Sequence, residues 1–563
     1  MTKISEQSKK HIVFVTGGVL SSLGKGVLTS ALGTLLEAQG DKVTAMKLDP
    51  YINVDAGTMN PKEHGEVFVT EDGFETDQDL GNYERFTNHI ITSKNHSVTN
   101  GQIWQNIINK ERSGDYGGKC VEYSAITNEI ISRILKVQEE TNADYTLVEL
   151  GGTVGETLHQ WFLDALRLMK FDGHNIVFIH MGLVPTPSKV GEQKTKPLQE
   201  SIHMIRGRGI IPDFIVGRSE LPLDEERKKK IARNCSIPYE HIISANDVDN
   251  IYKIPVNLLK QEFDIKLLGV FNERFRREKS EIILKPWLEL VNKIDNIPKE
   301  KILNIGMVGK YQNTGAFTLA DTYISVIQSL KIAAWHQGYN VNIRWINSED
   351  FEKYKANIYQ LDNLECIVVP GGFGSRGIEG KINAIKHARL NKIPFLGLCY
   401  GLQLAVVEYA RNVLNLKDAN SEEVDKNSPH PVIHILPEQA KKLAEGDFGG
   451  SMRLGSYEAE LKEGTIAHNL YNSTLITERH RHRLEVNQEY VKALEEHGLI
   501  ISGINPQRNL VEFIELPTTV HPFFLATQAH PEFKSRFMHP SPPFKGLIQK
   551  AIERKNNYIT PKI

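Results

Sequence analysis

The chain has 563 residues, of which 67 are basic (Lys and Arg) and 69 are acidic (Asp and Glu), so its net charge is −2. At roughly 150 residues per domain, this length allows about four small domains or two large α/β domains. The balanced charge excludes the basic surface expected of a protein that binds a nucleic-acid polymer, but it leaves a nucleotide as a candidate ligand. With 40% hydrophobic and 24% charged residues, the composition indicates a globular protein.

The cysteines and the N-terminus indicate the compartment. Cys120, Cys235, Cys366 and Cys399 form no CxxC or CxxH pattern, so neither a disulfide framework nor a structural zinc site is predicted. The apolar stretch before Thr16 is too short for a signal peptide, and no run of about 18 apolar residues follows. We therefore expect a cytoplasmic protein that does not enter a membrane.

The first half of the chain alternates short apolar runs with helical patterns. The first run ends in glycines, and the leucines that follow share one face of a predicted helix. This order predicts a mainly parallel sheet covered by helices on both faces, which is a mononucleotide-binding α/β fold. The predicted strands are 11–18, 43–48, 144–152, 174–182 and 212–219.

A charged stretch with two prolines, 286–300, separates this half from a second set of apolar runs. We therefore predict two α/β domains, residues 1–285 and residues 301–563, joined by a linker at 286–300. The strands predicted for the second domain are 302–309, 341–346, 365–372 and 393–399.

A glycine-rich turn, 17–26 (GGVLSSLGKG), joins the first predicted strand to its helix. Backbone N–H groups and a helix N-terminus favour an anion there, and Lys25 offers a charge to phosphate. Five residues rather than four separate Gly18 from Gly24, and Gly26 replaces the Ser or Thr that would contact magnesium. The turn predicts a nucleotide phosphate site whose metal ion has other ligands; a glycine-rich turn without a ligand is the alternative.

Two acidic residues are candidate metal ligands. Asp79 ends the acidic string 75–79, and Glu149 lies at the carboxyl end of a predicted strand, where α/β folds place ligands. Magnesium prefers such oxygens, although an isolated acidic residue is more often a solvated surface group.

Basic residues between 194 and 230 are candidates for a second triphosphate. Lys194 and Lys196 precede Gln199, and Arg218 and Lys230 follow. Several cations close to a phosphate-binding domain can neutralise a triphosphate. The alternative is a set of lysines on a solvated helix face, above all at 227–230.

The second half carries a cysteine between a predicted strand and a helix. Gly397 and Gly401 flank Cys399, an arrangement typical of a nucleophile elbow. The glycines permit a strained turn, and the helix N-terminus stabilises a thiolate. The alternative is a buried structural cysteine.

A cysteine nucleophile needs a general base held by a third group. His530 and Glu532 supply both, so we predict the triad Cys399, His530 and Glu532. The segment 371–374 (GGFG) ends a predicted strand and can aim backbone N–H groups at the oxyanion of a tetrahedral intermediate.

These motifs resemble those of the class I, triad-type glutamine amidotransferases, and nearly the whole chain resembles the CTP synthase family. The resemblance rests on strings such as VTGGVLSSLGKG, MKLDPYINVDAGTMNP, HGEVFVTEDGFETDQDLGNYERF, KTKP and ERHRHRLEVN. It implies a dethiobiotin-synthetase-like phosphate-loop domain with amidoligase activity, followed by a class I glutamine amidotransferase domain.

The resemblance also implies the reaction and its regulation. ATP would phosphorylate O4 of UTP, and ammonia from glutamine would displace the phosphate to give CTP. The family uses Mg²⁺, is activated by GTP, is inhibited by CTP and forms homotetramers.

The site residues implied by the resemblance fall into groups. The ATP group is Ser21, Ser22, Leu23, Gly24, Lys25, Gly26, Lys47, Asp79, Arg218 and Asp247. The UTP and CTP group is Ser21, Glu156, Lys194, Lys196, Gln199 and Lys230. The glutamine group is Gly372, Leu398, Gln403, Glu423 and Arg483. Asp79 and Glu149 would hold magnesium, and His64 would gate the passage of ammonia.

The departures from the family pattern cluster around the expected pyrimidine pocket. Where the family usually reads GGTVGDIES, residues 151–159 read GGTVGETLH, so Leu158 replaces an acidic residue. A family stretch Q-x-x-P-H-I-T appears at 122–127 in a shorter form without the histidine. These differences leave open a paralogue that aminates a different nucleotide or pyrimidine-like substrate. A cobyrinate-amidase-like ligase and a non-catalytic filament or regulatory protein fit less well, because the DPYINVDAG and KTKP strings and the catalytic residues are present.

Overall fold

The protein folds into two compact units. The computed structural model describes residues 10–60, 64–92, 94–189, 191–309, 320–353, 355–372, 374, 376–435 and 452–559. One unit comprises Met1–Ala56 and Asp79–Val291, and the other comprises Gly57–Gln78 and Asn292–Ile563. Among the described residues, no helix is both long enough and apolar enough to cross a membrane.

The first unit is built on a parallel sheet whose described strands have the order β5-β2-β6-β1-β7-β8-β9. The strands are β1 (His11–Gly18), β2 (Val43–Asp49), β5 (Ser97–Thr99), β6 (Tyr145–Leu150), β7 (Asn175–Leu183), β8 (Phe214–Ser219) and β9 (Ile242–Asn246). β1, β2 and β6 are buried along their whole length, which explains why they read as continuous apolar runs. The carboxyl end of β1 lies between that of β6 and that of β7, where such folds bind ligands.

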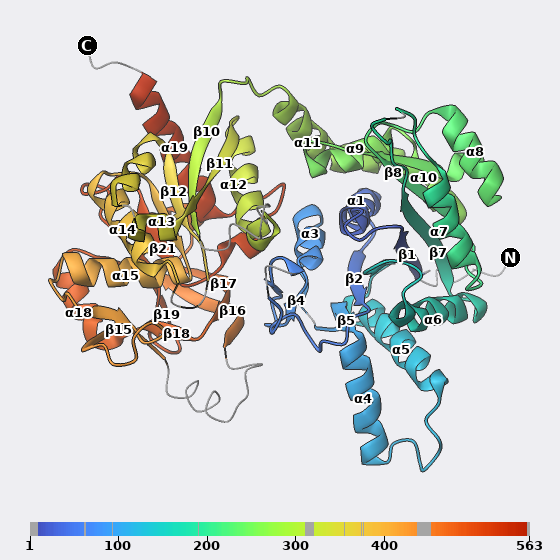
Figure 1. Ribbon diagram of the computed structural model, residues 1–563, viewed down its shortest axis with the longest axis horizontal. Helices are drawn as coiled ribbons and strands as arrows, with labels where there is room; N and C mark the ends of the chain where they lie inside the picture. Colours follow the sequence, from blue (N-terminus) through green and yellow to red (C-terminus); the bar gives the residue numbers. More distant parts are fainter. Residues whose placement is uncertain are drawn as a thin grey trace. The chain divides into compact units, whose positions relative to one another are not determined.

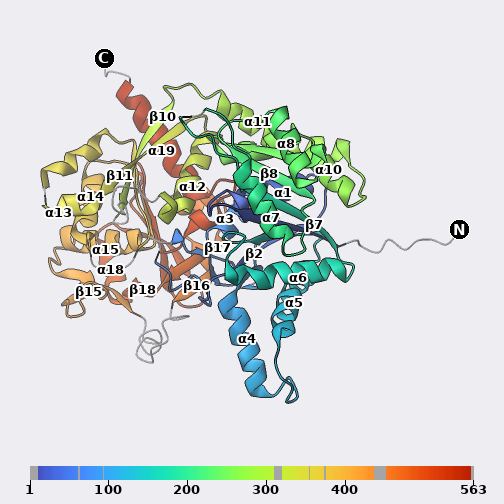
Figure 2. The same ribbon diagram turned by 45° about the vertical axis from the view of Figure 1, so that its right-hand side comes forward.

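Helices cover both faces of this sheet. Ile12 and Phe14 pack in a core with apolar residues of α4, α5 and α6, whereas α1 contacts β1, β2 and β6 from the side to which Val13 points. In Figures 1 and 2, α4 and α5 project from the sheet as a long helical hairpin. The helices are α1 (Lys25–Glu37), α3 (Asp79–Phe86), α4 (Asn100–Ser113), α5 (Tyr123–Thr141), α6 (Gln160–Phe171), α7 (Lys196–Arg206), α8 (Glu225–Cys235), α9 (Ile254–Leu259), α10 (Phe263–Val270) and α11 (Arg277–Asp295).

The second unit has a mixed sheet whose described strands have the order β11-β10-β12-β13-β21-β20-β19-β16-β17. The half from β11 to β21 is parallel and the half from β21 to β17 is antiparallel. The strands are β10 (Ile302–Gly309), β11 (Asn340–Asn347), β12 (Cys366–Val369), β13 (Phe395–Leu398), β16 (Arg453–Leu461), β17 (Leu475–His482), β19 (Ile500–Asn505), β20 (Leu510–Glu515) and β21 (Phe524–Thr527). A small sheet adds β14 (Ala419–Ser421), β15 (His430–Ile435) and β18 (Leu484–Val486).

Helices bury both faces of the mixed sheet in two apolar clusters. One cluster includes residues of α14 and α15, and the other includes residues of α12 and α19. The helices are α12 (Ile324–His336), α13 (Ser348–Lys353), α14 (Ile378–Leu390), α15 (Tyr400–Asn412), α17 (Ile466–Tyr471), α18 (Gln488–Glu496) and α19 (Pro542–Ile559).

The second unit also contains a hairpin from the first half of the sequence, formed by β3 (Phe68–Val69) and β4 (Glu75–Thr76). The N–H of Ser456 on β16 donates to the carbonyl of Glu71 at 3.0 Å. Gly73 approaches β16 so closely that a Cβ atom there would lie 2.7 Å from the Leu454 carbonyl oxygen. The hairpin is therefore held against the sheet by backbone contacts.

The fold class predicted from the sequence is confirmed: both parts are α/β, and the sheet of the first is parallel. The two units differ from the predicted domain division at the hairpin segment and at 286–300. The helix α11 continues through Pro286 to Asp295, because Leu284, Trp287 and Val291 bury one face of it. Most of this stretch, including Pro286, therefore lies on a helix, and only its end with Pro298 lies beyond it.

Candidate active sites

The turn after β1 has the backbone of an anion-binding loop. Val19, Ser22 and Gly24 all have positive φ angles, and Gly24 occupies the N-cap position of α1 without a side chain to cap the helix. The N–H groups of the first turn of α1 are therefore directed toward the loop, where they favour an anion.

Lys25 lies over this loop. Its Nζ donates to the carbonyl of Gly152 at 2.7 Å, and its side chain is only 6% exposed. A Cβ atom on Gly17 would lie 2.8 Å from Lys25 Cδ, so the lysine folds back across the glycines. Burial lowers the pKa of Lys25, while Glu149 opposes the shift and Lys47 adds to it.

Lys47, Asp79 and Glu149 form a charged cluster beside the loop. The Nζ of Lys47 lies 2.6 Å from Asp79 Oδ2, and Lys47 and Glu149 are register partners on β2 and β6. Burial raises the pKa of Glu149 to about 8, the charge of Asp79 adds to this shift, and Lys47 opposes it. Burial also tends to raise the pKa of Asp79, but Lys47 outweighs it and the pKa is lowered.

The two carboxylates suit a magnesium ion. Their oxygens are hard donors, and a Cβ atom at Gly26 would overlap Asp79 Oδ1, so the glycine leaves space for this carboxylate at the first turn of α1. No group of three or more His, Cys, Asp or Glu side chains among the described residues could hold a metal ion alone. Magnesium commonly completes its shell with phosphate oxygens and water, so two carboxylates suffice.

Arg218 and Asp247, expected at the adenine nucleotide, lie together beside the phosphate loop. Arg218 Nε lies 2.6 Å from Asp247 Oδ1, and its Nη1 donates to the carbonyl of Leu23 at 3.1 Å. The structure thus brings the carboxyl ends of β8 and β9 to the same loop.

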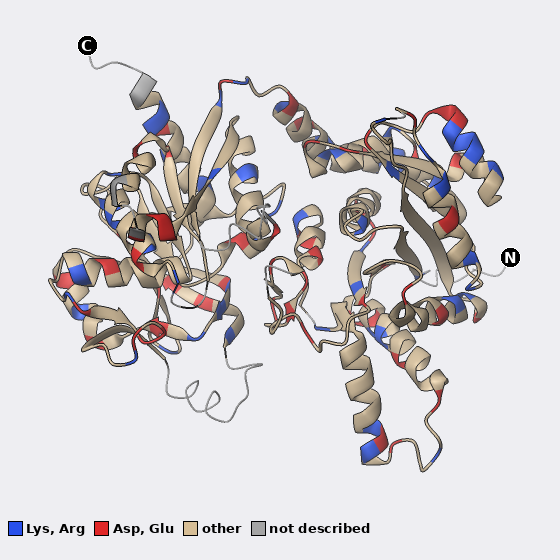
Figure 3. Ribbon diagram, viewed as in Figure 1, with Lys and Arg blue, Asp and Glu red and all other residues tan. Residues whose placement is uncertain are grey.

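Of the residues expected at the second triphosphate, Lys196 and Gln199 lie on α7 and Lys230 lies on the neighbouring α8, whereas Lys194 precedes α7. Gln199 is buried on α7 and its Oε1 accepts from Asn234 on α8 at 3.2 Å. Lys196 lies one turn before Gln199, and Lys230 lies one turn before Asn234. Lys196 and Lys230 are exposed, whereas Lys194 is half-buried and pairs with Glu192 at 2.8 Å. In Figure 3, α8 carries both basic residues (blue) and acidic residues (red).

The loop with the unusual sequence, 151–159, is held by contacts within the loop and by residues outside it. Glu156 is exposed, and its Oε1 accepts from the N–H of Thr153 at 3.1 Å. Leu158 is half-buried, and its carbonyl accepts from Asn100 Nδ2 at 3.2 Å. The buried His159 bonds the Gly151 carbonyl through Nε2 at 2.6 Å.

Cys399 occupies the strained turn that its flanking glycines predict. It caps α15 with a φ of 50° and a ψ of −99°, and its N–H donates to the Thr527 carbonyl at 2.7 Å. The Sγ atom donates to the carbonyl oxygen of Arg481 at 3.8 Å and also accepts from Gln528 Nε2 at 3.8 Å. The thiol therefore faces the strand β17 rather than the core.

His530 is oriented by Glu532 and lies close to Cys399. Its Nδ1 lies 2.7 Å from Glu532 Oε1, and its buried Nε2 has no hydrogen-bond partner among the described residues. A Cβ atom on Gly371 would lie 2.8 Å from His530 Cε1 and 3.7 Å from Cys399 Cβ. Burial tends to lower the pKa of His530, but Glu532 and Cys399 outweigh it and raise the pKa to about 10.

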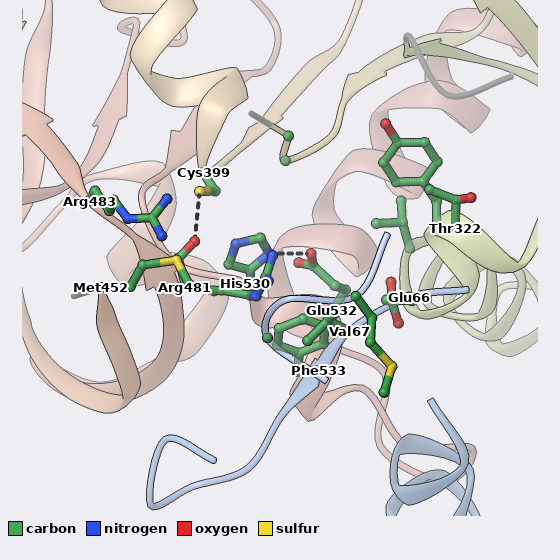
Figure 4. A pocket seen from close by; sticks show the side chains of 16 residues that line it. Glu66, Val67, Thr322, Cys399, Met452, Arg481, Arg483, His530, Glu532 and Phe533 are labelled. Carbon is green, nitrogen blue, oxygen red and sulfur yellow. Dashed lines mark hydrogen bonds and ion pairs between the residues drawn. The ribbon is translucent and has the colours of Figure 1, made fainter. Parts of the chain in front are cut away.

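A cavity of about 220 Å³ opens onto these side chains. Figure 4 shows Cys399, His530, Arg481 and Arg483 around it, with the dashed contacts of the thiol and of Glu532. Gly371 and Gly372 line the same cavity, where their N–H groups can reach an oxyanion. Phe373, in the predicted oxyanion segment, lies outside the described residues.

Among the residues expected to hold glutamine, Gly372 and Arg483 line this cavity, whereas Leu398, Gln403 and Glu423 are not among its lining residues. Leu398 ends β13 directly before the thiol. Glu423 Oε1 accepts from the N–H of Gly374 at 2.5 Å, and the charge of Glu423 opposes the lowering of the Arg483 pKa that burial causes. Gln403 is buried and donates to the Leu484 carbonyl at 2.9 Å. His64 is exposed in the segment 57–78, and the described residues lining the cavity do not include it.

Three groups near the two sites were not singled out from the sequence. Tyr83 donates a hydrogen bond to Glu149, Arg481 accepts from the thiol through its carbonyl, and Glu66 lines the cavity. Each of these residues lies in one of the strings that carry the family resemblance, but nothing in the neighbouring sequence indicates the contact that the residue makes.

Comparisons with known proteins match both units. Residues 10–272 match the model of the CTP synthase N-terminus, and residues 318–550 match that of the class-I glutamine amidotransferases. The CTP synthase of Methanococcus aeolicus is 48% identical over 96% of this chain and 99% of its own length. That of Bacillus subtilis is 48% identical over 97% and 99%, and that of Carboxydothermus hydrogenoformans is 50% identical over 96% and 98%.

A phosphate-loop α/β unit and a glutamine amidotransferase unit in one chain define a glutamine-hydrolysing, ATP-dependent ligase. The similarity extends over nearly the full length of both this chain and its relatives, so the chain belongs to the CTP synthase family.

Proposed function

We propose that the chain aminates UTP to CTP, using ATP to activate the pyrimidine and glutamine as the source of ammonia. The observation that carries the proposal is the cluster of Lys25, Lys47, Asp79 and Glu149 at the phosphate loop of a chain that also contains Cys399 and His530. Family membership supports the choice of substrates.

In the first unit, the phosphate loop and Lys25 would bind the ATP phosphates. Lys47 would balance the charge of the transferring phosphoryl group, since phosphoryl transfer depends mainly on positioning and electrostatic stabilisation. Asp79 and Glu149 would hold Mg²⁺, which neutralises phosphate charge when bound. Arg218 and Asp247 would contact the adenine nucleotide.

The UTP and CTP triphosphate would be bound by Lys194, Lys196, Gln199 and Lys230. Two further contacts are proposed for UTP and CTP. Ser21 lies in the phosphate loop, and Glu156 lies in the altered segment 151–159. Once O4 of UTP carries the phosphoryl group, ammonia attacks C4 and phosphate leaves.

In the second unit, the Cys399 thiolate would attack the carboxamide carbon of glutamine. Protonated His530 would give its proton to the leaving ammonia, and Glu532 would hold the imidazole in place. The N–H groups of Gly371 and Gly372 would stabilise the oxyanion, and Glu423 and Arg483 would hold the amino-acid end. Water then hydrolyses the thioester to release glutamate.

Regulation and assembly follow from the same proposal. GTP would activate glutamine hydrolysis, CTP would inhibit by occupying the product site, and the active form would be a homotetramer in the cytoplasm. His64 would gate the passage of ammonia.

The decisive experiment is incubation of the purified protein with ATP, Mg²⁺ and glutamine across a panel of nucleoside triphosphates, with the aminated product identified by mass. We expect CTP from UTP. Amination of another nucleotide, with UTP unreacted, would contradict the proposal and identify a paralogue.

Asp79→Asn and Glu149→Gln should abolish synthesis with glutamine and with ammonia, and full ammonia-dependent turnover at ordinary magnesium would refute the metal assignment.

A further inference from the structure

The strand β17 presents different residues on its two faces. Arg479 and Arg481 point toward the β3–β4 hairpin, whereas His480 and His482 point into a buried polar network with Glu512. The alternation of arginine and histidine in this string therefore follows the period of two of a strand.

The backbone of β17 contacts the two reacting residues: it bonds the backbone N–H of His530 and the thiol of Cys399. The carbonyl of Arg479 accepts from the N–H of His530 at 2.7 Å, and the carbonyl of Arg481 accepts from Cys399 Sγ at 3.8 Å. A shift of β17 would thus move the histidine and the environment of the thiol together.

The hairpin holds β17 through ion pairs. Glu71 lies 2.9 Å from Arg479 Nε and 3.2 Å from Lys534 Nζ, and Glu75 lies 2.7 Å from Arg481 Nε. Burial tends to raise the pKa of Glu71, but Arg479 and Lys534 outweigh it and lower the pKa to about 2. Arg479 is fully buried, so its guanidinium depends on these partners and on the Val69 carbonyl at 3.1 Å.

Two aromatic contacts, one edge-on and one stacked, lead from the hairpin to the catalytic base. Phe68 is fully buried, and its ring centroid lies 5.1 Å from that of Phe533 at an interplanar angle of 65°. The ring of Phe533 in turn stacks on His530 at 5.1 Å and 15°. Since Glu532 fixes one edge of the imidazole, this stack fixes its plane.

We infer that Phe68 and Glu71 are positioning residues of the glutaminase centre: they act on His530 through Phe533 and through Arg479. The inference rests on the proposed roles of Cys399 and His530. It assigns to a segment from the N-terminal half of the sequence a part in glutamine hydrolysis, separate from nucleotide binding.

The test compares Phe68→Leu and Glu71→Gln in the full-length protein with two matched controls. Glu379→Gln breaks another Glu–Arg pair of the same unit, with Arg411 at 2.9 Å, and Phe544→Leu shortens another fully buried phenylalanine. We expect kcat for glutamine hydrolysis to fall about 10- to 100-fold in the two hairpin variants, because small displacements of reacting groups cost rates of this size. KM for glutamine and synthesis from ammonium salts should change less than about threefold, and both controls should resemble the parent.

A double variant distinguishes positioning from general destabilisation. Phe68→Leu combined with Phe533→Leu should lose no more activity than Phe533→Leu alone, since both changes interrupt the same pair of aromatic contacts. Parental kcat in both hairpin variants, or losses that match the controls at equal melting temperature, would overturn the inference. Glutamine hydrolysis that survives in Cys399→Ala would instead overturn the proposed function, whatever the hairpin variants do.

Discussion

The carboxylate of Asp79 occupies the space that a side chain at Gly26 would fill. Gly26 lies in the first turn of α1, and Asp79 is the first residue of α3. A standard phosphate loop has a Ser or Thr at this place, whose hydroxyl contacts magnesium. Here the glycine makes room for a carboxylate from another helix, so in the proposed site the magnesium ligand would come from a distant part of the sequence.

Gly26→Ala should therefore displace Asp79 and disturb the ion pair with Lys47. We expect synthesis to fall at least about tenfold with ammonia as well as with glutamine, because both reactions need the phosphoryl-transfer site. Gly269→Ala is the matched control, since a Cβ atom there meets nothing within 4 Å. Steady-state rates of both variants decide the matter, and parental activity in Gly26→Ala would show that Asp79 is not needed at this position.

Cys399→Ala should separate the two nitrogen sources. Glutamine-dependent synthesis should disappear, whereas synthesis from added ammonium salts should persist, because in the proposed mechanism the thiolate serves only to release ammonia. Product formation with each source in the same preparation provides the measurement. Equal loss of both activities in a folded variant would contradict the division of labour between the units.

The raised pKa of His530 predicts the pH range of glutamine hydrolysis. With a pKa of about 10, the imidazolium persists through neutral pH and is lost only as the pH rises through that value. Its contribution to stability is likewise complete below its unfolded pKa of about 6.5 and lost as the pH passes 10. His480 and His482 remain neutral in this range, because burial lowers their pKa values.

Glu532→Gln removes the main group that raises this pKa. The alkaline limb of the kcat/KM profile for glutamine should then move to lower pH by at least about one unit. Profiles of parent and variant measured between pH 6 and about 10.5 give the comparison. An unchanged alkaline limb would mean that a group other than His530 determines it.

Leu158 predicts weak inhibition by CTP. The leucine replaces an acidic residue suited to the exocyclic amine of cytosine, and the neighbouring Glu156 is bonded to its own loop at Thr153. An unpaired polar group costs about 1 to 3 kcal/mol, so the inhibition constant of the parent should exceed that of Leu158→Glu roughly 5- to 150-fold. UTP turnover should change less. Equal inhibition constants at fixed UTP would mean that Leu158 only packs at the edge of the pocket.

The sequence predicts those features that depend on neighbouring residues. Glycines mark the turn after β1 and the strained conformation of Cys399, since both need backbone angles that few residues adopt. Parallel strands such as β1 and β6 are buried along their whole length, so their sequences are continuous apolar runs that can be recognised.

Contacts between residues far apart in the sequence could not be predicted from neighbouring residues. The strands β3 and β4 are only two residues long each, so they have no periodicity, and Glu71 meets Arg479 across 408 positions of sequence. Pro286 suggested a break, but the apolar spacing around it maintains the helix α11. In each case tertiary packing, rather than local preference, decides the structure.

The hairpin makes the second unit discontinuous along the gene. A gene fragment that begins at the codon for Asn292 would encode β17 with its two arginines, but its product would lack Glu71, Glu75 and the ring of Phe68. Such a fragment is not an interchangeable module, because the residues that complete it are encoded more than two hundred codons upstream. Any recombination that exchanged glutaminase units between relatives would therefore have to carry this short segment along or find a compatible one in the recipient.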